Sequence, residues 1–312
     1  MSDKILIAVP AFNEEENIEK TISELKKINS INFDLLVVND GSSDNTLNLL
    51  LGLDINYILT SKNNFGLAKV FKSIKNFAIE KDFDYLVIFD ADLQYPAEQI
   101  PELIYEQKLN GSNIVVGERV FTKNKIFNPI KTFLQKTGSK VVSVVSGIKL
   151  LDVTSGFRLY DKVALNLIEI TDSFTYTIES ILQSKHKNLK ISTVQLKYFN
   201  KTRESRLVKS NFNYVMNTTS TLINYVFTYR YRLLRNSITI ITLFFSLIIM
   251  SRFFVPYFRD GSNPGNIQSL VFGSFLILLI LSINALILSR VNYFKLVRIE
   301  NKIFKFNYHQ LI

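Results

Sequence analysis

The sequence predicts an α/β domain with a mostly parallel sheet, followed by helices that enter a membrane. Over residues 1 to about 200, short and nearly continuous apolar runs alternate with longer segments of helical spacing. This alternation is typical of a parallel sheet covered by helices on both faces. Near the C-terminus, two long apolar segments carry almost no charge, which is rare in the core of a soluble protein.

The elements of the first part can be assigned in chain order. Apolar runs predict strands over residues 4–9, 34–38, 55–59, 85–90 and 114–117. Apolar residues at helical spacing predict helices over residues 13–28, 44–51, 67–79 and 96–108. In the first of these helices, Ile18, Ile22 and Leu25 recur at steps of four and three, and acidic residues occupy the first turn, where the helix dipole favours them.

Polar clusters follow three of the predicted strands, over residues 10–16, 39–44 and 90–94. Ligands of parallel α/β sheets bind at the carboxyl ends of the strands. We therefore expect the three clusters to form one site at this edge of the sheet.

Composition limits the classes of function. The 312 residues carry a formal net charge of +10, which suggests an anionic partner such as nucleic acid, an acidic lipid surface or a phosphorylated substrate. The absence of cysteine excludes disulfides and thiolate metal sites, and two histidines argue against a histidine-rich metal site. Because the basic residues concentrate around the apolar segments and no aromatic–basic recognition motif stands out, we expect no nucleic-acid partner.

The two apolar segments predict transmembrane helices. Residues 236–251 contain no charged residue, residues 252–255 extend them to the roughly 20 residues that a bilayer requires, and residues 269–289 form the second segment. Basic residues precede the first segment and follow the second, which places both ends in the cytoplasm by the positive-inside rule. The N-terminus does not read as a signal peptide, in keeping with a cytoplasmic N-terminal part. The alternative is a buried helical hairpin of a soluble protein.

These assignments divide the chain into four parts. They are a cytoplasmic catalytic domain (1–206), a juxtamembrane amphipathic helical region (207–235), two transmembrane helices with a short external loop (236–289) and a cytoplasmic tail (290–312). In the juxtamembrane region, apolar residues from Phe212 to Val226 recur at steps of three and four, so this helix either lies in the membrane surface or packs on the catalytic domain.

The cluster after residue 89 predicts a metal site. In an extended segment, Asp90, Asp92 and Gln94 share one face. Three oxygen ligands suit Mg²⁺ or Mn²⁺, which could hold the diphosphate of a nucleotide at the edge of the sheet. The alternative is an acidic turn that caps the helix beginning at Pro96.

Six motifs in order resemble the inverting nucleotide-sugar glycosyltransferases of family 2, which have the GT-A fold. The greatest likeness is to the membrane-anchored group of dolichyl-phosphate mannose synthase and bacterial polyprenyl-phosphate glucosyltransferase, and it covers about residues 4 to 210. The motifs are VPAFNEEENI (9–18), VVNDGSSDNT (37–46), FGLAKV (65–70), IFDADLQYP (88–96), VVGERV (115–120) and LDVTSGFRLY (151–160).

The resemblance implies a donor site. Pro10, Phe12 and Glu14 would contact the base and ribose, with Asp40 helping to hold the base and Gly66 forming a nearby turn. Asp90, Ala91 and Asp92 would bind the nucleotide sugar, with Asp90, Asp92 and Gln94 as the metal ligands. Without the resemblance, residues 10–12 are a strand exit, Glu14 is an acid at a helix start, and residues 38–44 form a tight turn with an N-cap.

The resemblance also implies an acceptor site. Arg119 would bind the acceptor phosphate, joined by Lys131. Arg158 would either help to build the pocket or pair with Asp152, and Glu179 would be an acid near the acceptor or an exposed helix residue.

The chain departs from the family pattern in two stretches. Relatives carry R-x-x-G-x-S-K where this chain has Asn200, Arg203 and Arg206 at the first, fourth and last positions. It also has Gln195-Leu196 where they often carry Glu-Pro. Arg203 and Arg206 can still supply positive charge to the acceptor phosphate.

The expected function is inverting transfer of a hexose from a UDP- or GDP-sugar to a polyprenyl phosphate at the cytoplasmic membrane face, with Mg²⁺ or Mn²⁺. A phosphate monoester is already anionic near pH 7, so it needs cationic positioning more than a general base. Alternatives are transfer to another lipid hydroxyl with Asp152 or Glu179 as base, and a catalytically inactive membrane scaffold. Processive polysaccharide synthases usually carry a Q-x-x-R-W stretch, and this chain has no tryptophan, so that function is disfavoured. Two spans per subunit allow a homo-oligomer.

Overall fold

The computed structural model describes residues 3–119, 139–140, 142–143, 147–148, 152–170, 176–199, 220, 231–260, 267–303 and 309–311. The chain forms two compact units. The first comprises Met1–Thr221 together with Lys305–Ile312, and the second comprises Leu222–Phe304.

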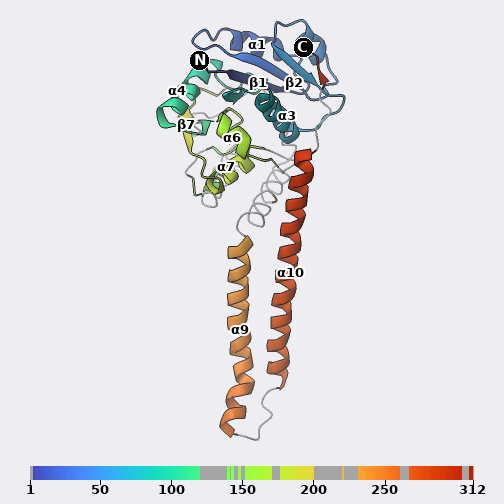
Figure 1. Ribbon diagram of the computed structural model, residues 1–312, viewed down its shortest axis with the longest axis vertical. Coiled ribbons are helices and arrows are strands. Elements are labelled where there is room, and N and C mark those ends of the chain that lie inside the picture. Colours follow the sequence, from blue (N-terminus) through green and yellow to red (C-terminus); the bar gives the residue numbers. More distant parts are fainter. Residues whose placement is uncertain are drawn as a thin grey trace. The chain divides into compact units, whose positions relative to one another are not determined.

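The first unit is built on a mixed sheet whose described strands have the order β7-β5-β6-β4-β1-β2-β3-β8 (Figure 1). The strands are β1 (Ile5–Ala11), β2 (Asp34–Asn39), β3 (Tyr57–Thr60), β4 (Tyr85–Ile88), β5 (Ile114–Glu118), β6 (Arg158–Asp161), β7 (Ile191–Gln195) and β8 (His309–Gln310). The central strands β4, β1, β2 and β3 are parallel, which confirms the predicted α/β pattern. Strand β6 is antiparallel to both β4 and β5, and β8 is antiparallel to β3, so the sheet is mostly rather than wholly parallel.

Helices cover both faces of this sheet (Figure 1). Alternate residues of β1 point to opposite faces, so Ile5, Ile7 and Val9 enter one core while Leu6 and Ala8 enter the other. The first core contains apolar residues of α1 (Ile18–Lys26), α2 (Thr46–Leu51) and α4 (Ile100–Asn110). The second contains those of α3 (Leu67–Glu80), α6 (Lys162–Leu167) and α7 (Tyr176–His186).

Most predicted elements agree with the structure to within a few residues, and two differ for local reasons. Helix α1 begins at Ile18 instead of residue 13, because Asn13 has a left-handed backbone (φ 56°) and the following residues form a turn. The helix predicted over 96–108 is divided into a 3₁₀ turn, η1 (Ala97–Gln99), and α4.

The second unit is a helical hairpin of α9 (Tyr231–Asp260) and α10 (Ile267–Ile303). The helices run antiparallel, since Thr239 accepts a hydrogen bond from Asn284 while Ser246 donates one to the carbonyl of Gly273. Large apolar side chains point outward along both helices, including Ile240, Phe244, Leu247, Val271, Phe275 and Leu281. Within the described residues, Val271–Val291 is long and apolar enough to cross a membrane, and Arg235–Ile249 is a shorter apolar helix. The structure thus supports one of the two predicted spans by length and composition.

The C-terminal residues return to the first unit. Gln310 and His309 lie opposite Leu59 and Thr60 of β3, and the amide of Leu311 donates to the carbonyl of Ile58 at 3.0 Å. Strand β8 therefore covers the edge of the sheet that β3 would otherwise leave open.

Candidate functional site

The polar clusters after β1 and β2 lie side by side, as predicted, because their loops are hydrogen-bonded to each other. The amide of Asn13 donates to Ser42 Oγ at 2.9 Å, and the amide of Ser43 donates to Asn13 Oδ1 at 2.8 Å. The amide of Glu14 donates to Thr46 Oγ1 at 2.8 Å. Each loop thus fixes the other at the carboxyl edge of the sheet.

The three residues predicted to contact the base and ribose differ in how accessible they are to solvent. Phe12 is exposed, with 37% of its surface accessible, and Pro10 is half-buried. Glu14 is buried at the start of the turn. Phe12 is therefore the residue of this group most accessible to a planar ligand.

Asp40 is buried and organises the loop that leads into α3. Its carboxylate accepts hydrogen bonds from the amides of Phe65 (3.0 Å) and Gly66 (2.8 Å). Gly66 has a φ of 86°, a backbone that favours glycine, and an added side chain at this position would meet open space. Asp40 and Gly66 are thus parts of one loop, although 26 residues separate them.

The acidic segment after β4 is a turn and not an extended strand. Strand β4 ends at Ile88, and Leu93 has a left-handed backbone with a φ of 58°. The amide of Gln94 donates to Asp92 Oδ1 at 3.2 Å, which closes the turn. The predicted alternation of an extended segment is therefore wrong here, because the left-handed residue changes the direction of the chain between Asp92 and Gln94.

The environment of Asp90 disfavours its ionised form. Burial, together with the charges of Asp92 and Glu14 and against the opposing effect of Arg119, raises the pKa of Asp90 to about 7. Two neighbouring carboxylates whose ionised forms repel each other suit a divalent cation, which neutralises both. In the described part of the chain no cluster of three or more histidine, cysteine or acidic residues could hold a metal, so Gln94 or substrate oxygens would complete the ligand set.

Arg119, at the end of β5, forms a buried ion pair with Asp152. Its Nε and one terminal nitrogen donate to the two carboxylate oxygens at 2.5 and 2.9 Å, and the same terminal nitrogen donates to Thr154 Oγ1 at 2.7 Å. The guanidinium also lies 5.1 Å from the ring centre of Phe199. Burial alone would raise the pKa of Asp152, but Arg119 and Thr154 together hold it below its usual value.

Arg158 and Glu179 have structural partners. Arg158 is fully buried and donates to the carbonyls of Val153, Ser155 and Thr177. The partner of Asp152 is Arg119, so the predicted pairing with Arg158 is wrong. Glu179 is buried and accepts a hydrogen bond from Gln183 at 3.0 Å, so the reading as an exposed helix residue is wrong as well.

Sequence reasoning missed Gly156 and the two tyrosines that hold it. Gly156 packs against the carboxylate of Asp90, and its peptide groups are hydrogen-bonded to Tyr95 and Tyr176. The glycine stood within a quoted motif, but nothing in the sequence indicates that it contacts a carboxylate 66 positions earlier. Lys131, Arg203 and Arg206, predicted for the acceptor site, lie outside the described residues, as does Asn200.

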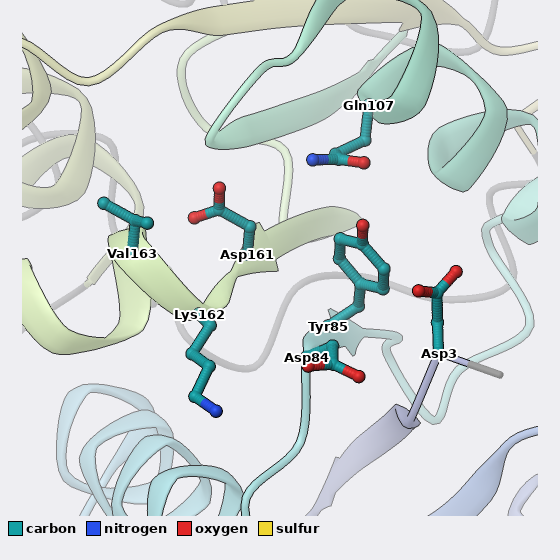
Figure 2. Close-up of a pocket in the computed structure, with 7 residues that line it drawn as sticks. All are labelled: Asp3, Asp84, Tyr85, Gln107, Asp161, Lys162 and Val163. Atoms are coloured by element: carbon teal, nitrogen blue, oxygen red, sulfur yellow. The ribbon is translucent and has the colours of Figure 1, made fainter. Parts of the chain in front are cut away.

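A separate pocket of about 410 Å³ lies at the opposite end of the sheet (Figure 2). It lies near the start of β4 and the end of β6, where Tyr85 is paired with Asp161. Its acids already have partners, since Lys108 pairs with Asp3 and Lys4 donates its amide to Asp84. None of the predicted site residues lines this pocket, which is lined by Asp3, Asp84, Tyr85, Gln107, Asp161, Lys162 and Val163.

The family model described as glycosyl transferase family 2 matches residues 6–168, which hold the loops and turns described above. The chain belongs to this family. The match begins within β1 and ends just after α6, so it contains both carboxylates of the turn and the ion pair of Arg119.

Two of the relatives carry names that refer to polyprenyl phosphates. The chain is 34% identical over 151 residues to a dolichol-phosphate mannosyltransferase of Pyrococcus furiosus, covering 47% of this chain and 41% of the relative. It is 28% identical over 152 residues to an undecaprenyl-phosphate 4-deoxy-4-formamido-L-arabinose transferase of Proteus mirabilis, covering 46% and 43%. An uncharacterized glycosyltransferase of Synechocystis is 30% identical over 181 residues, 54% of each chain. The chain thus spans about half the length of the curated relatives it matches.

Solved structures share the fold. Glucosyl-3-phosphoglycerate synthase from Mycobacterium tuberculosis, in complex with Mn²⁺, UDP and glucosyl-3-phosphoglycerate, matches with a TM-score of 0.55 and 16% identity, covering 72% of this chain and 78% of that one. The same enzyme with Mn²⁺ and UDP-glucose has a TM-score of 0.54. The first unit therefore has the GT-A fold.

Proposed function

We propose that the protein transfers a hexose, with inversion, from a nucleotide sugar to a polyprenyl phosphate at the cytoplasmic face of a membrane. The observation that carries this proposal is the pair of carboxylates, Asp90 and Asp92, in the turn after β4. The pKa of Asp90 is raised to about 7 by burial and by the neighbouring charge of Asp92, and both residues lie within the segment that matches family 2. The names of the relatives from Pyrococcus and Proteus support the class of acceptor.

The donor would bind at the edge formed by the loops after β1, β2 and β4. The base and ribose would contact Pro10, Phe12 and Glu14, and the loop held by Asp40 and Gly66 would close one side. Asp90, Asp92 and Gln94 would hold Mg²⁺ or Mn²⁺. When bound, such an ion supplies charge that stabilises the departing diphosphate.

The acceptor phosphate would bind at Arg119. Its guanidinium is held in a fixed orientation by Asp152 and Thr154, which reduces the entropy lost when a phosphate binds. The side chain keeps 11% of its surface accessible, whereas Asp152 keeps 1%, so Arg119 is the more exposed member of the pair. Lys131, Arg203 and Arg206 would add positive charge from the adjoining segments.

A phosphate acceptor suits this site better than a neutral hydroxyl. An alcohol needs a general base, and the two acids predicted for that role are engaged. Arg119 holds the pKa of Asp152 low, and Glu179 is buried against Gln183. A phosphate oxygen is already nucleophilic: it forms a bond to the anomeric carbon as the bond from that carbon to the diphosphate oxygen breaks, which inverts the configuration.

The hairpin would place the enzyme where a polyprenyl chain is dissolved. Within α10, Val271–Val291 has the apolar length that a bilayer requires, and α9 contains the shorter apolar segment Arg235–Ile249. Their apolar side chains point outward, while Asn284, Thr239 and Ser246 make hydrogen bonds between the helices, an arrangement that suits a lipid surrounding. We infer two spans, because the chain enters the hairpin from the first unit and returns to that unit.

The test is transfer of radiolabelled sugar into an organic phase from a panel of UDP- and GDP-sugars, with Mn²⁺ or Mg²⁺. Polyprenyl phosphate, polyprenol and diacylglycerol serve as competing acceptors. We expect label only with the phosphate, at least 100-fold less product with Asp92→Asn, and normal activity with Asp54→Asn, which changes an exposed carboxylate. Transfer to polyprenol, or full activity of Asp92→Asn in a folded protein, would contradict the proposal.

A further inference from the structure

Gly156 forms a wall of the turn that contains Asp90. A side-chain carbon added at Gly156 would lie 2.9 and 3.0 Å from the two carboxylate oxygens of Asp90 and 3.3 Å from its carboxyl carbon. These distances are shorter than an ordinary contact between carbon and oxygen. Glycine thus allows the carboxylate to occupy its present position.

The peptide groups of Gly156 are fixed on both sides by buried tyrosines. The Gly156 amide donates to Tyr95 Oη at 3.1 Å, and the Gly156 carbonyl accepts from Tyr176 Oη at 3.1 Å. Both rings are themselves held in stacks, Tyr95 against Phe157 at 5.5 Å and Tyr176 against Phe71 at 4.1 Å between ring centres. The backbone at Gly156 therefore has little freedom to move away from Asp90.

The need for glycine here is steric rather than conformational. The φ angle of Gly156 lies outside the left-handed region, so alanine can adopt the same backbone. The contact that alanine would make too short is with the end of a short acidic side chain, which can rotate. Alanine should consequently move Asp90 without unfolding the protein.

We propose that Gly156 is a positioning residue that sets where the Asp90 carboxylate lies for metal and donor binding. This inference rests on the proposed metal-dependent transfer. A metal ligand tolerates displacements of only about 0.5 Å before binding weakens, and Mg²⁺ demands nearly ideal geometry. To restore ordinary contacts of 3.4 Å, the carboxylate would have to move by about 0.5 Å, which reaches that tolerance.

The experiment measures Mn²⁺ binding to the full-length protein in detergent, by the loss of the free-ion electron paramagnetic resonance signal, together with thermal unfolding in EDTA. For Gly156→Ala we expect the dissociation constant for Mn²⁺ to rise at least tenfold, while the melting temperature of the metal-free protein changes by about 2 °C or less. Tyr95→Phe, which removes one hydroxyl that fixes the Gly156 peptide, should raise the dissociation constant two- to fivefold.

Gly52→Ala is the matched control. An added carbon at this glycine would lie 3.5 Å from the carbonyl oxygen of Leu49, which is an ordinary contact, so we expect neither the melting temperature nor the Mn²⁺ affinity to change. Gly117→Ala is not a neutral control, because an added carbon there would lie 2.4 Å from the ring of Phe157, which stacks on Tyr95.

The outcomes separate this inference from the proposed function. If the wild type binds Mn²⁺ and Gly156→Ala binds it equally well, the positioning role is refuted while the metal site stands. The same holds if Gly156→Ala lowers the melting temperature and leaves Mn²⁺ affinity unchanged. If the wild type binds no Mn²⁺, the proposed function itself fails. Should Gly156→Ala not fold, unchanged affinity in Tyr95→Phe and Tyr176→Phe would refute the role.

Discussion

Replacing Asp90 with asparagine should stabilise the metal-free protein while abolishing its activity. The raised pKa of Asp90, from 3.8 to about 7, means that the folded state holds its proton more tightly than the unfolded chain does. The main cause is burial of the carboxylate, and the charge of Asp92 adds to it. Ionised Asp90 therefore destabilises the folded protein whenever no cation is bound.

The magnitude follows from the pKa difference. Well below pH 4 the carboxyl group is protonated in both states and has no effect. As the pH rises from about 4 to 7, the unfolded chain loses its proton first, so stability falls. Each pKa unit corresponds to about 1.4 kcal/mol, so the shift of roughly three units destabilises the protein above pH 7 by up to about 4 kcal/mol.

The assay is thermal unfolding of wild type and Asp90→Asn in detergent with EDTA, at pH 4.5 and pH 8. Asparagine has nearly the same shape and carries no charge, so the variant should melt higher at pH 8. With about 2–4 °C per kcal/mol for a domain of this size, the increase is on the order of 10 °C. At pH 4.5 the unfolded carboxyl group is already largely ionised while the folded one is protonated, so the difference should fall to about a quarter of its value at pH 8.

Excess Mn²⁺ provides an internal check on the same samples. The ion should raise the melting temperature of the wild type and leave Asp90→Asn almost unchanged, because only the wild type offers both carboxylates. A variant that melts at or below the wild-type temperature at pH 8 in EDTA would refute the electrostatic reasoning.

Two further substitutions test the acceptor site and the donor loop. Arg119→Lys keeps the charge but loses the bidentate contact with Asp152. In steady-state kinetics we expect the KM for polyprenyl phosphate to rise about tenfold, while the KM for the nucleotide sugar stays unchanged. Equal changes in both constants would argue against a role at the acceptor. Gly41 has a φ of 70°, and an added carbon there would lie 2.5 Å from the carbonyl carbon of Asn63. Gly41→Ala should therefore lower the melting temperature by several degrees and raise the KM for the nucleotide sugar. A variant with wild-type melting and kinetics would show that this loop is not needed.

The sequence predicted the parts of the fold that depend on local pattern. The central strands and their helices follow from hydrophobic periodicity, which is read within a short window. Strand β6 lies between β4 and β5 and runs antiparallel to both, which depends on pairings between residues such as Leu86 and Tyr160, far apart in the chain. No local signal in residues 158–161 specifies that direction.

In the candidate site, too, local sequence pattern predicted some features, while others depend on contacts between distant residues. Asp90 and Asp92 could be found because they directly follow a buried apolar run. The turn itself could not be predicted, since a left-handed leucine at position 93 is contrary to the preference of that residue. The partnership of Arg119 with Asp152 spans 33 residues and needed the folded sheet to become visible.

Strand β8 means that the first unit is discontinuous in sequence. A fragment ending before the hairpin would lack His309 and Gln310, so the edge of β3 with which they pair would be left bare. Such an edge invites pairing with other chains. Fragments made for crystallisation should accordingly join residues 305–312 back to the domain through a linker, and affinity tags belong at the N-terminus.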